Sequence, residues 1–205
     1  MTKQEFASRL QNACAAVTAA EQELTEIDSR FGDADHGLTM SKIAKAVSAA
    51  AGESEGGIQA MLDDAAMAVM VLNGGSAVPL WNTWLDGLQE EAPEGNEIDT
   101  AGIQAIFAKA LKALSDMSGA KVGDKTMMDA VVPAVEAAQA CASDDPADVF
   151  AAAADAAEAG AAASEQFASK FGRARSYGEQ TIGTPDAGAV STSLFFRGLA
   201  NAARP

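Results

Sequence analysis

The sequence predicts an all-α protein, and three observations favour this fold class. Alanine, the residue with the highest helix propensity, occurs 48 times among the 205 residues. Apolar residues recur at spacings of three and four along most of the chain, as expected for helices that bury one face. No segment alternates strictly between apolar and polar residues, which is the pattern of a half-buried strand. We therefore expect one all-α domain, residues 1–205, whose helices pack closely through small side chains.

The first four helices are expected before residue 89. Thr2 and Glu5 form a capping-box pattern at the start of the first helix, and its apolar face continues to Ile27. An Asn-Gly-Gly turn at 73–75 ends the third helix. The fourth contains both tryptophans, for which we expect a packing role. The expected ranges are 2–27, 37–51, 58–72 and about 80–88.

The last four helices are separated by Gly-bearing turns. Gly119 ends the fifth helix, and the sixth starts after Asp124. Pro133 lies inside the sixth helix and predicts a kink or a local break. The seventh is rich in alanine and begins at Pro146, and the eighth follows Asp186. The expected ranges are about 103–117, 125–135, 146–170 and 187–199.

The composition limits the partners. The chain has 14 Lys and Arg against 29 Asp and Glu, a formal charge of −15, which argues against binding to nucleic acid or an anionic membrane. No apolar run is long enough to span a bilayer, and the first residues lack the apolar core of a signal peptide. Cys14 and Cys141 form no disulfide framework and are expected to be reduced thiols. We therefore expect a cytoplasmic protein.

The turn at residues 28–37 carries three carboxylates that packing does not require. Asp28, Asp33 and Asp35 cannot share one face of a continuous helix, but a loop between two helices can bring them together. Clustered carboxylate oxygens suit Mg²⁺ or Ca²⁺. A helix that begins near His36 would favour phosphate oxygens at its N-terminus.

A structural interpretation of the same turn stays open. Asp35 could be an N-cap, with Asp28 and Asp33 solvated near helix ends. An EF-hand does not fit, because the positions for the turn glycine and the bidentate glutamate, counted from Asp33, hold Leu38 and Ala44.

Three further Gly-containing turns lie at residues 73–79, 119–129 and 172–189. Each alone is typical of a helix cap or connection. The chain has no Walker A loop, no Gly-x-Gly-x-x-Gly fingerprint after a strand and no protein-kinase motifs. His36 is the only histidine, which excludes a multi-histidine zinc site, and no nucleophile elbow supports a Ser-His-Asp triad.

Taken in order, the four turns resemble those of the nucleotide-binding L subunit of dihydroxyacetone kinase and the related L domain of single-chain kinases. The resemblance covers nearly the whole chain and implies an eight-helix antiparallel barrel with a nucleotide, ADP or ATP, at one end. Its most specific segments are Gly32-Asp33-Ala34-Asp35-His36-Gly37, Gly123-Asp124-Lys125-Thr126-Met127, Gly172-Arg173-Ala174, Gly178-Glu179 and Asp186-Ala187-Gly188-Ala189.

The resemblance also implies roles for individual residues. Asp28, Asp33 and Asp35 would hold two Mg²⁺ ions that bridge the nucleotide phosphates, and together with Arg173 they would be the catalytic residues. The residues that would contact the nucleotide are His36, Gly37, Leu38, Thr39, Ser76, Ala77, Ser118, Met127, Arg173, Asp186, Ala187 and Gly188.

Three segments depart from the family pattern, all of them at the implied nucleotide pocket or its rim. Residues 74–79 read Gly-Gly-Ser-Ala-Val-Pro where the family has Gly-Gly-Ala-Ser-Gly-Pro. Ser118 occupies a position where the family has glycine, and residues 173–177 read Arg-Ala-Arg-Ser-Tyr in place of Arg-Ala-Ser-Tyr. These changes leave open whether the chain serves another sugar or another partner.

By this resemblance the chain is a phosphotransferase subunit. A phosphoryl group would pass from a Mg-bound adenine nucleotide to a small ketose, dihydroxyacetone or similar, held on a separate K-type subunit. The sequence does not tell whether nucleotide is exchanged or stays bound and is recharged by a phosphocarrier protein. Two other functions stay open: a non-catalytic nucleotide-bound module that engages a partner such as a transcription regulator, and a helical interaction protein that binds only a structural divalent cation.

Overall fold

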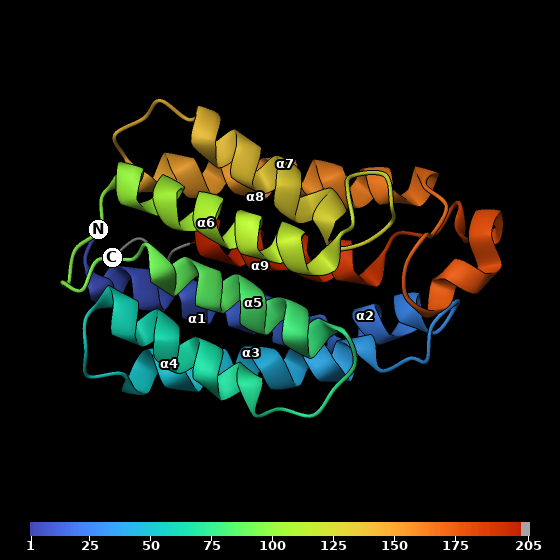
Figure 1. Ribbon diagram of the computed structural model, residues 1–205, viewed down its shortest axis with the longest axis horizontal. Coiled ribbons are helices and arrows are strands. Elements are labelled where there is room, and N and C mark those ends of the chain that lie inside the picture. Colours follow the sequence, from blue (N-terminus) through green and yellow to red (C-terminus); the bar gives the residue numbers. More distant parts are fainter. Residues whose placement is uncertain (202–205) are drawn as a thin grey trace.

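Helices account for most of residues 1–201, the part of the chain that the computed structural model describes (Figure 1). The elements in order are α1 (Lys3–Ala19), α2 (Glu21–Asp28), α3 (His36–Glu53), α4 (Ile58–Met70), α5 (Ala77–Glu90), α6 (Thr100–Ser118), α7 (Met128–Ala140), α8 (Pro146–Ala163), η1 (Ser164–Gln166), η2 (Arg173–Thr181) and α9 (Ala187–Ala200). None of these described elements is a strand, so the predicted all-α class is confirmed.

The long helices form a closed ring. Each helix from α3 to α9 packs against the one that precedes it in sequence, and α9 packs against α1 to close the circle. Because successive helices reverse direction, the arrangement is the expected eight-helix antiparallel barrel, with α2 extending α1 (Figure 1).

Most helix boundaries differ from the sequence-based ranges: α7, for example, is Met128–Ala140 where about 125–135 is expected, and α5 is Ala77–Glu90 where about 80–88 is expected. The first helix is divided at Ala20, shortly after the Thr18 hydroxyl donates to the carbonyl of Cys14, a bond that often bends helices. The seventh ends at Ala163 instead of residue 170, because the chain continues as the short 3₁₀ turn η1. The third ends at Met70 instead of residue 72.

Of the kink or local break expected at Pro133, the break does not occur, since α7 is one continuous helix that contains this proline. Proline has no N–H to donate to the carbonyl of Asp129, four residues earlier. Gly160 of α8 packs at this carbonyl, where an added Cβ would lie only 2.0 Å from the oxygen. The close approach of α8 therefore covers the carbonyl that Pro133 leaves unpaired.

Small residues and a few aromatic rings fill the inside of the ring. Trp84, Phe107 and Phe196 are buried and meet one another at ring-centroid distances of 5.7–5.9 Å. At Gly87 and Gly198 neighbouring helices approach so closely that an added Cβ would lie 2.6 and 2.3 Å from a facing Cα atom. The expected packing through slim side chains is confirmed, and both tryptophans are buried.

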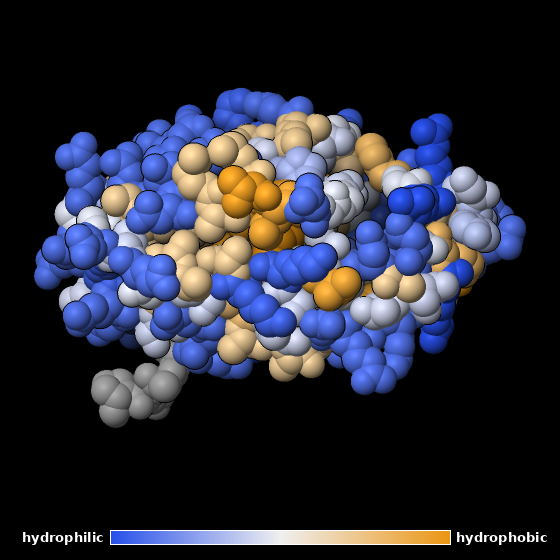
Figure 2. Space-filling view, turned by 90° about the horizontal axis from the view of Figure 1, so that it is seen from below, coloured by the Kyte–Doolittle hydropathy of each residue, from blue (hydrophilic) through white to orange (hydrophobic). Residues whose placement is uncertain are grey.

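The two ends of the barrel differ. Both labelled termini lie at one end, on the left of Figure 1, and the connections that follow α2, α4, α6 and α8 all lie at the other. We call this second end the loop end. Hydrophilic residues cover most of the face shown in Figure 2, with hydrophobic groups between them. No helix among residues 1–201 is long and apolar enough to cross a membrane, and both cysteines are unpaired.

Candidate functional site

A cavity of about 740 Å³ opens at the loop end of the barrel. All four Gly-containing turns singled out in the sequence contribute to its wall. The residues of the implied site that line it are Asp28, Asp33, Asp35, His36, Thr39, Ser76, Ala77, Ser118, Met127, Arg173, Asp186, Ala187 and Gly188. Segments far apart in sequence are thus brought to one place by the antiparallel ring.

Two residues of the implied site do not line the cavity. Gly37 is buried against α2, where a Cβ would lie 2.0 Å from the carbonyl oxygen of Glu21. Leu38 is 49% exposed to solvent. His36 and Thr39, three residues apart and therefore on one face of α3, do line the cavity.

The carboxylates of Asp28, Asp33 and Asp35 converge at the cavity wall. One oxygen from each lies within 4.8 Å of the others. Asp28 Oδ2 accepts hydrogen bonds from the backbone N–H groups of Asp35, at 3.1 Å, and His36, at 3.4 Å. Gly32 makes room for this arrangement, since a Cβ there would lie 2.0 Å from Asp28 Oδ1. The loop therefore folds around the Asp28 carboxylate.

The capping interpretation of this turn fails for Asp35 but holds in part for Asp28. Asp35 occupies the N-cap position of α3, yet its side chain makes no capping hydrogen bond. Asp28 instead supplies the oxygen that accepts from the start of the helix. The Asp35 carboxylate is left available to a ligand.

The charges around the cluster favour a cation. Partial burial and the negative charges of Asp33 and Asp28 raise the pKa of Asp35. Arg173 Nη2 lies 2.6 Å from Asp33 Oδ2 and offsets part of this charge. Three carboxylates at such separations are a suitable ligand set for a hard divalent ion such as Mg²⁺.

Two of the helices that begin at the cavity, α3 and α5, have no side-chain cap, whereas Asp186 caps α9 there. The N-cap residues of α3 and α5, Asp35 and Ser76, make no side-chain capping bond. At the opposite end, Thr2, Asp99 and Asp145 cap α1, α6 and α8 through their side chains. Uncapped helix N-termini present N–H donors and the positive end of the helix dipole, which favours an anion in the cavity.

His36 and Asp186 lie on the α3–α9 side of the cavity. His36 Nε2 is 3.0 Å from the hydroxyl oxygen of Ser191, and burial lowers the pKa of the imidazole. Asp186 caps α9 by accepting from the N–H of Ala189 at 2.8 Å. Enclosure by the protein raises the pKa of Asp186 from 3.8 to about 7, although its N-cap bonds act in the opposite direction.

Sequence reasoning assigned no role to two residues that organise the wall. Asp129 is buried, and its two carboxylate oxygens accept from the N–H groups of Gly123, at 2.6 Å, and Thr126, at 2.7 Å. Lys125, between them, is buried and lines the cavity. The three-residue spacing of Thr126 and Asp129 at a helix start is a capping pattern that could have identified the carboxylate.

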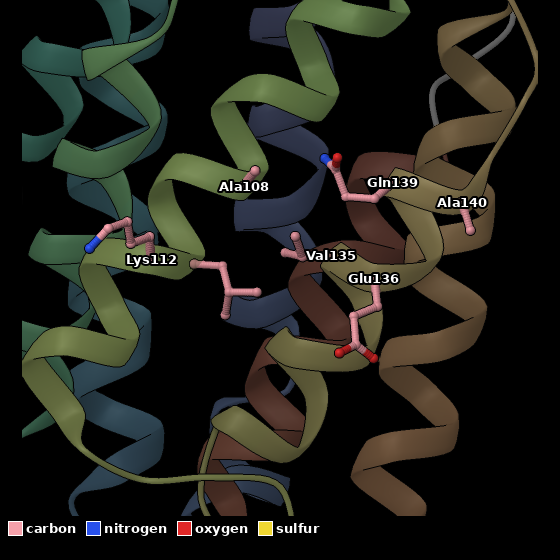
Figure 3. Close-up of a pocket in the computed structure, with 7 residues that line it drawn as sticks. Ala108, Lys112, Val135, Glu136, Gln139 and Ala140 are labelled. Carbon is pink, nitrogen blue, oxygen red and sulfur yellow. The ribbon is translucent and has the colours of Figure 1, made fainter.

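A second hollow, of about 560 Å³, lies between α6 and α7, far along the barrel wall (Figure 3). Its lining is mostly aliphatic, and the charged ends of Lys112 and Glu136 point in different directions. Its polar groups do not converge on one point, so the loop-end cavity is the candidate site.

The chain is similar to a known domain family and to known kinases. The DAK2 domain matches residues 30–201. The D-erythrulose kinase of Mycolicibacterium smegmatis is 38% identical over 91% of this chain, which spans only 33% of that enzyme's length. The ADP-binding subunit DhaL of the PEP-dependent dihydroxyacetone kinase 2 of Listeria innocua is 31% identical, over 91% of this chain and 88% of that subunit.

Solved structures show the same fold. The native dihydroxyacetone kinase of C. freundii superposes with a TM-score of 0.75 at 23% identity, covering 97% of this chain and 34% of that one. The structure of that kinase in complex with AMP-PNP and Mg²⁺ gives a TM-score of 0.71 at 22% identity, with the same coverage.

Proposed function

The chain belongs to the DAK2 domain family, and from this premise we propose that it is the nucleotide-binding phosphotransferase subunit of a dihydroxyacetone-kinase-like enzyme. Residues 1–205 would form one L-type domain. It would transfer a phosphoryl group from an adenine nucleotide to a small ketose held by a separate K-type subunit. The observation that carries this proposal is the carboxylate cluster at the wall of a cavity large enough for a nucleotide.

The cluster supports binding of the nucleotide together with metal. Asp28, Asp33 and Asp35 would hold two Mg²⁺ ions, which when bound would neutralise the phosphate charge. Burial and then the negative charges of Asp33 and Asp28 raise the pKa of Asp35, and a bound cation would offset those charges. A protein of charge −15 would otherwise repel a polyphosphate.

Residues around the cluster would orient the nucleotide. His36 and Thr39 of α3 and Ser76 and Ala77 of α5 lie at helix starts, where N–H groups favour phosphate oxygens. Arg173 would contribute a positive charge to the transferring phosphoryl group, because phosphoryl transfer depends chiefly on positioning and charge stabilisation. The remaining implied contacts are Ser118, Met127, Asp186, Ala187 and Gly188.

The surface around the cavity supports docking of a partner that carries the acceptor. The acceptor oxygen must lie close to the terminal phosphorus, so the ketose has to enter through the cavity mouth. Among the described residues, the large apolar side chains that are exposed all lie at the loop end. They are Leu38, Met67, Met70, Val71, Met117, Val122, Phe171, Tyr177 and Ile182. Exposed apolar side chains that gather at one end of a protein are typical of a protein-binding surface.

Two measurements test the proposal. Ketose phosphate is followed for this protein alone, for a K-type subunit alone and for the mixture, and we expect product only from the mixture. Robust product from this protein alone, with contaminating kinase excluded, would overturn the two-subunit mechanism. Tight nucleotide binding without product in any mixture would favour the non-catalytic module that engages a partner such as a transcription regulator.

The second measurement is thermal unfolding with ADP, in Mg²⁺ or in chelator. ADP at about a hundred times its dissociation constant should add about 2.7 kcal/mol of stability, and only when Mg²⁺ is present. Equal stabilisation in chelator would contradict a metal-bridged nucleotide. Mass spectrometry of the nucleotide released from freshly purified protein then tells whether it is exchanged or stays bound for recharging by a phosphocarrier protein.

A further inference from the structure

The segment between α8 and α9, residues 164–186, brings Arg173 to the mouth of the cavity. We call it the α8–α9 connection; in Figure 1 its 3₁₀ turn η2 lies beyond the ends of the barrel helices. The Arg173 side chain is 72% exposed, and its guanidinium reaches across to Asp33. Gly172 and Gly178 have positive φ angles of 62° and 52°, so the backbone here forms no regular helix. The place of Arg173 therefore depends on what fixes the connection.

The two ends of the connection are bonded to each other. The N–H of Gly183 donates to the carbonyl of Glu165 at 2.7 Å. The N–H of Asp186 donates to the hydroxyl of Ser164 at 2.9 Å. We call the residues 164–165 and 183–184 the neck, because they close the connection into a loop.

Lys125 joins the neck to the rest of the cavity wall. Its ammonium group donates to the carbonyl of Ser164 at 2.7 Å and to that of Thr184 at 2.5 Å, so one side chain holds both sides of the neck. Lys125 itself belongs to the α6–α7 loop and is only 5% exposed. A residue of one wall segment is thus bonded directly to another wall segment.

The α6–α7 loop holds Lys125 in place. The backbone of Lys125 has a φ of 60°, a conformation that non-glycine residues seldom adopt. The buried carboxylate of Asp129 accepts from the N–H groups of Gly123 and Thr126, on either side of Lys125. Strained backbone that the surroundings stabilise in this way is often found at functional sites.

Packing alone does not explain a lysine at this position. Burial lowers the pKa of the ammonium group, against the opposing charges of Asp186, Asp129 and Glu165. A methionine would fill similar space without the cost of removing a charge from water. Unlike methionine, lysine has N–H donors that reach the two carbonyls of the neck.

We propose that Lys125 is a positioning residue, whose bonds to the neck fix the α8–α9 connection so that Arg173 lies over the cavity. The consequence for ligand binding rests on the proposed function. The effect of Lys125 on the order of the α8–α9 connection does not rest on the proposed function.

The test compares two substitutions at Lys125 with a control substitution elsewhere in the α6–α7 loop. Lys125→Met keeps the length of the side chain and removes its donors, and Lys125→Arg keeps donors. Lys121→Met removes a charge from an exposed residue of the same loop, outside the cavity wall, and is the matched control. Affinity for ADP with saturating Mg²⁺ is measured by calorimetry, and order of the connection by amide hydrogen exchange of residues 171–183.

The expected results are specific to this role. Lys125→Met should lower the ADP affinity about tenfold and speed exchange in the connection while α1–α7 stay protected, and Lys125→Arg should recover most of the affinity. The control should change the affinity less than twofold. In the background of Arg173→Gln, Lys125→Met should cause little further loss, because it acts through Arg173. The proposal would be overturned if the double variant lost ADP affinity by the product of the two single losses. It would also be overturned if Lys125→Met left ADP affinity and hydrogen exchange unchanged.

If Lys125→Met does not fold, a second variant tests the proposal. The Thr181 hydroxyl accepts from the N–H of Ser169 and donates to the carbonyl of Gly178, so Thr181→Val loosens the connection from within at equal volume. Faster exchange with lower ADP affinity supports the proposal, and faster exchange with unchanged affinity overturns it. If the unmodified protein binds no ADP at all, the proposed function fails, while the exchange measurements still judge the role of Lys125.

Discussion

Replacement of Arg173 by glutamine should strengthen Mg²⁺ binding to the nucleotide-free protein and weaken nucleotide binding. Arg173 Nη2 lies 2.6 Å from Asp33 Oδ2, so under the proposed function its guanidinium would compete with a divalent ion for the Asp33 carboxylate. A metal ion that binds there without nucleotide would weaken this ion pair. In the loaded site the phosphates would replace Asp33 as the partner of Arg173.

The structure sets the size of the first effect. The Arg173 side chain is 72% exposed and that of Asp33 is 35% exposed, so the pair belongs to the solvent-screened class. Such pairs contribute about 0.2–1 kcal/mol, which corresponds to a rise in Mg²⁺ affinity of about 1.4-fold to 5-fold when the competitor is removed. Loss of a charged hydrogen bond to phosphate should lower the affinity for Mg·ADP by about tenfold.

Calorimetric titration of nucleotide-free protein with Mg²⁺, followed by ADP at saturating Mg²⁺, measures both effects. Arg175→Gln is the control, because Arg175 is exposed on the same connection and forms no ion pair among the described residues. An equal gain in Mg²⁺ affinity in both variants would show a general charge effect. Weaker Mg²⁺ binding in Arg173→Gln would refute the competition itself.

Three other predictions concern the metal cluster, the pH dependence of stability and the packing. Asp35→Asn keeps the side-chain volume but removes an anionic oxygen, so calorimetry should show at least a tenfold loss of Mg²⁺ affinity with unchanged circular dichroism; an unchanged affinity would contradict a ligand role. Because the pKa of Asp186 is 3.8 in the reference state and about 7 in the folded protein, its ionisation costs stability as the pH rises between these values. Asp186→Asn, which can still cap α9, should therefore raise the urea midpoint more at pH 8 than at pH 5, and an equal change at both would argue against this titration. Gly198→Ala should cost about 1–3 kcal/mol in thermal unfolding, because the added Cβ would lie 2.3 Å from the Cα of Ala13. Gly52→Ala meets only a flexible side chain and should gain up to about 1 kcal/mol, so similar changes in both would contradict the packing argument.

The helices could be predicted because their information is local, whereas their arrangement as a barrel was implied only by the family resemblance. Apolar spacing, Gly-bearing turns and the Thr2–Glu5 capping box are short-range patterns, and the capping box is present in the structure. The division at Ala20 and the continuity of α7 through Pro133 were not predicted. The division at Ala20 follows a side-chain bond to the backbone, and α7 packs beside Pro133 against Gly160, which is distant in sequence.

The candidate site was predictable to a similar extent. The convergence of Asp28, Asp33 and Asp35 follows from their place in one short loop. The family resemblance implied contacts for all of residues 36–39, although successive residues of a helix face different directions. Gly37 and Leu38 do not line the cavity, whereas their neighbours do. Lys125 could not be assigned a role from sequence, because its acceptors are carbonyls 39 and 59 residues away that have no characteristic side chain.

The closure of the ring by α9 against α1 has a consequence for the order of events during folding. The other contacts between ring neighbours join helices that are consecutive in sequence, or α1 and α3 across the short α2, whereas Arg9 Nη1 donates to the carbonyl of Leu199 across 190 residues. Contacts of such separation form late, since the intervening chain must first be ordered. The first residues of α9, Ala187 and Gly188, belong to the cavity wall. During synthesis on the ribosome the first seven ring helices can therefore associate as they emerge, but the cavity is completed only when α9 docks.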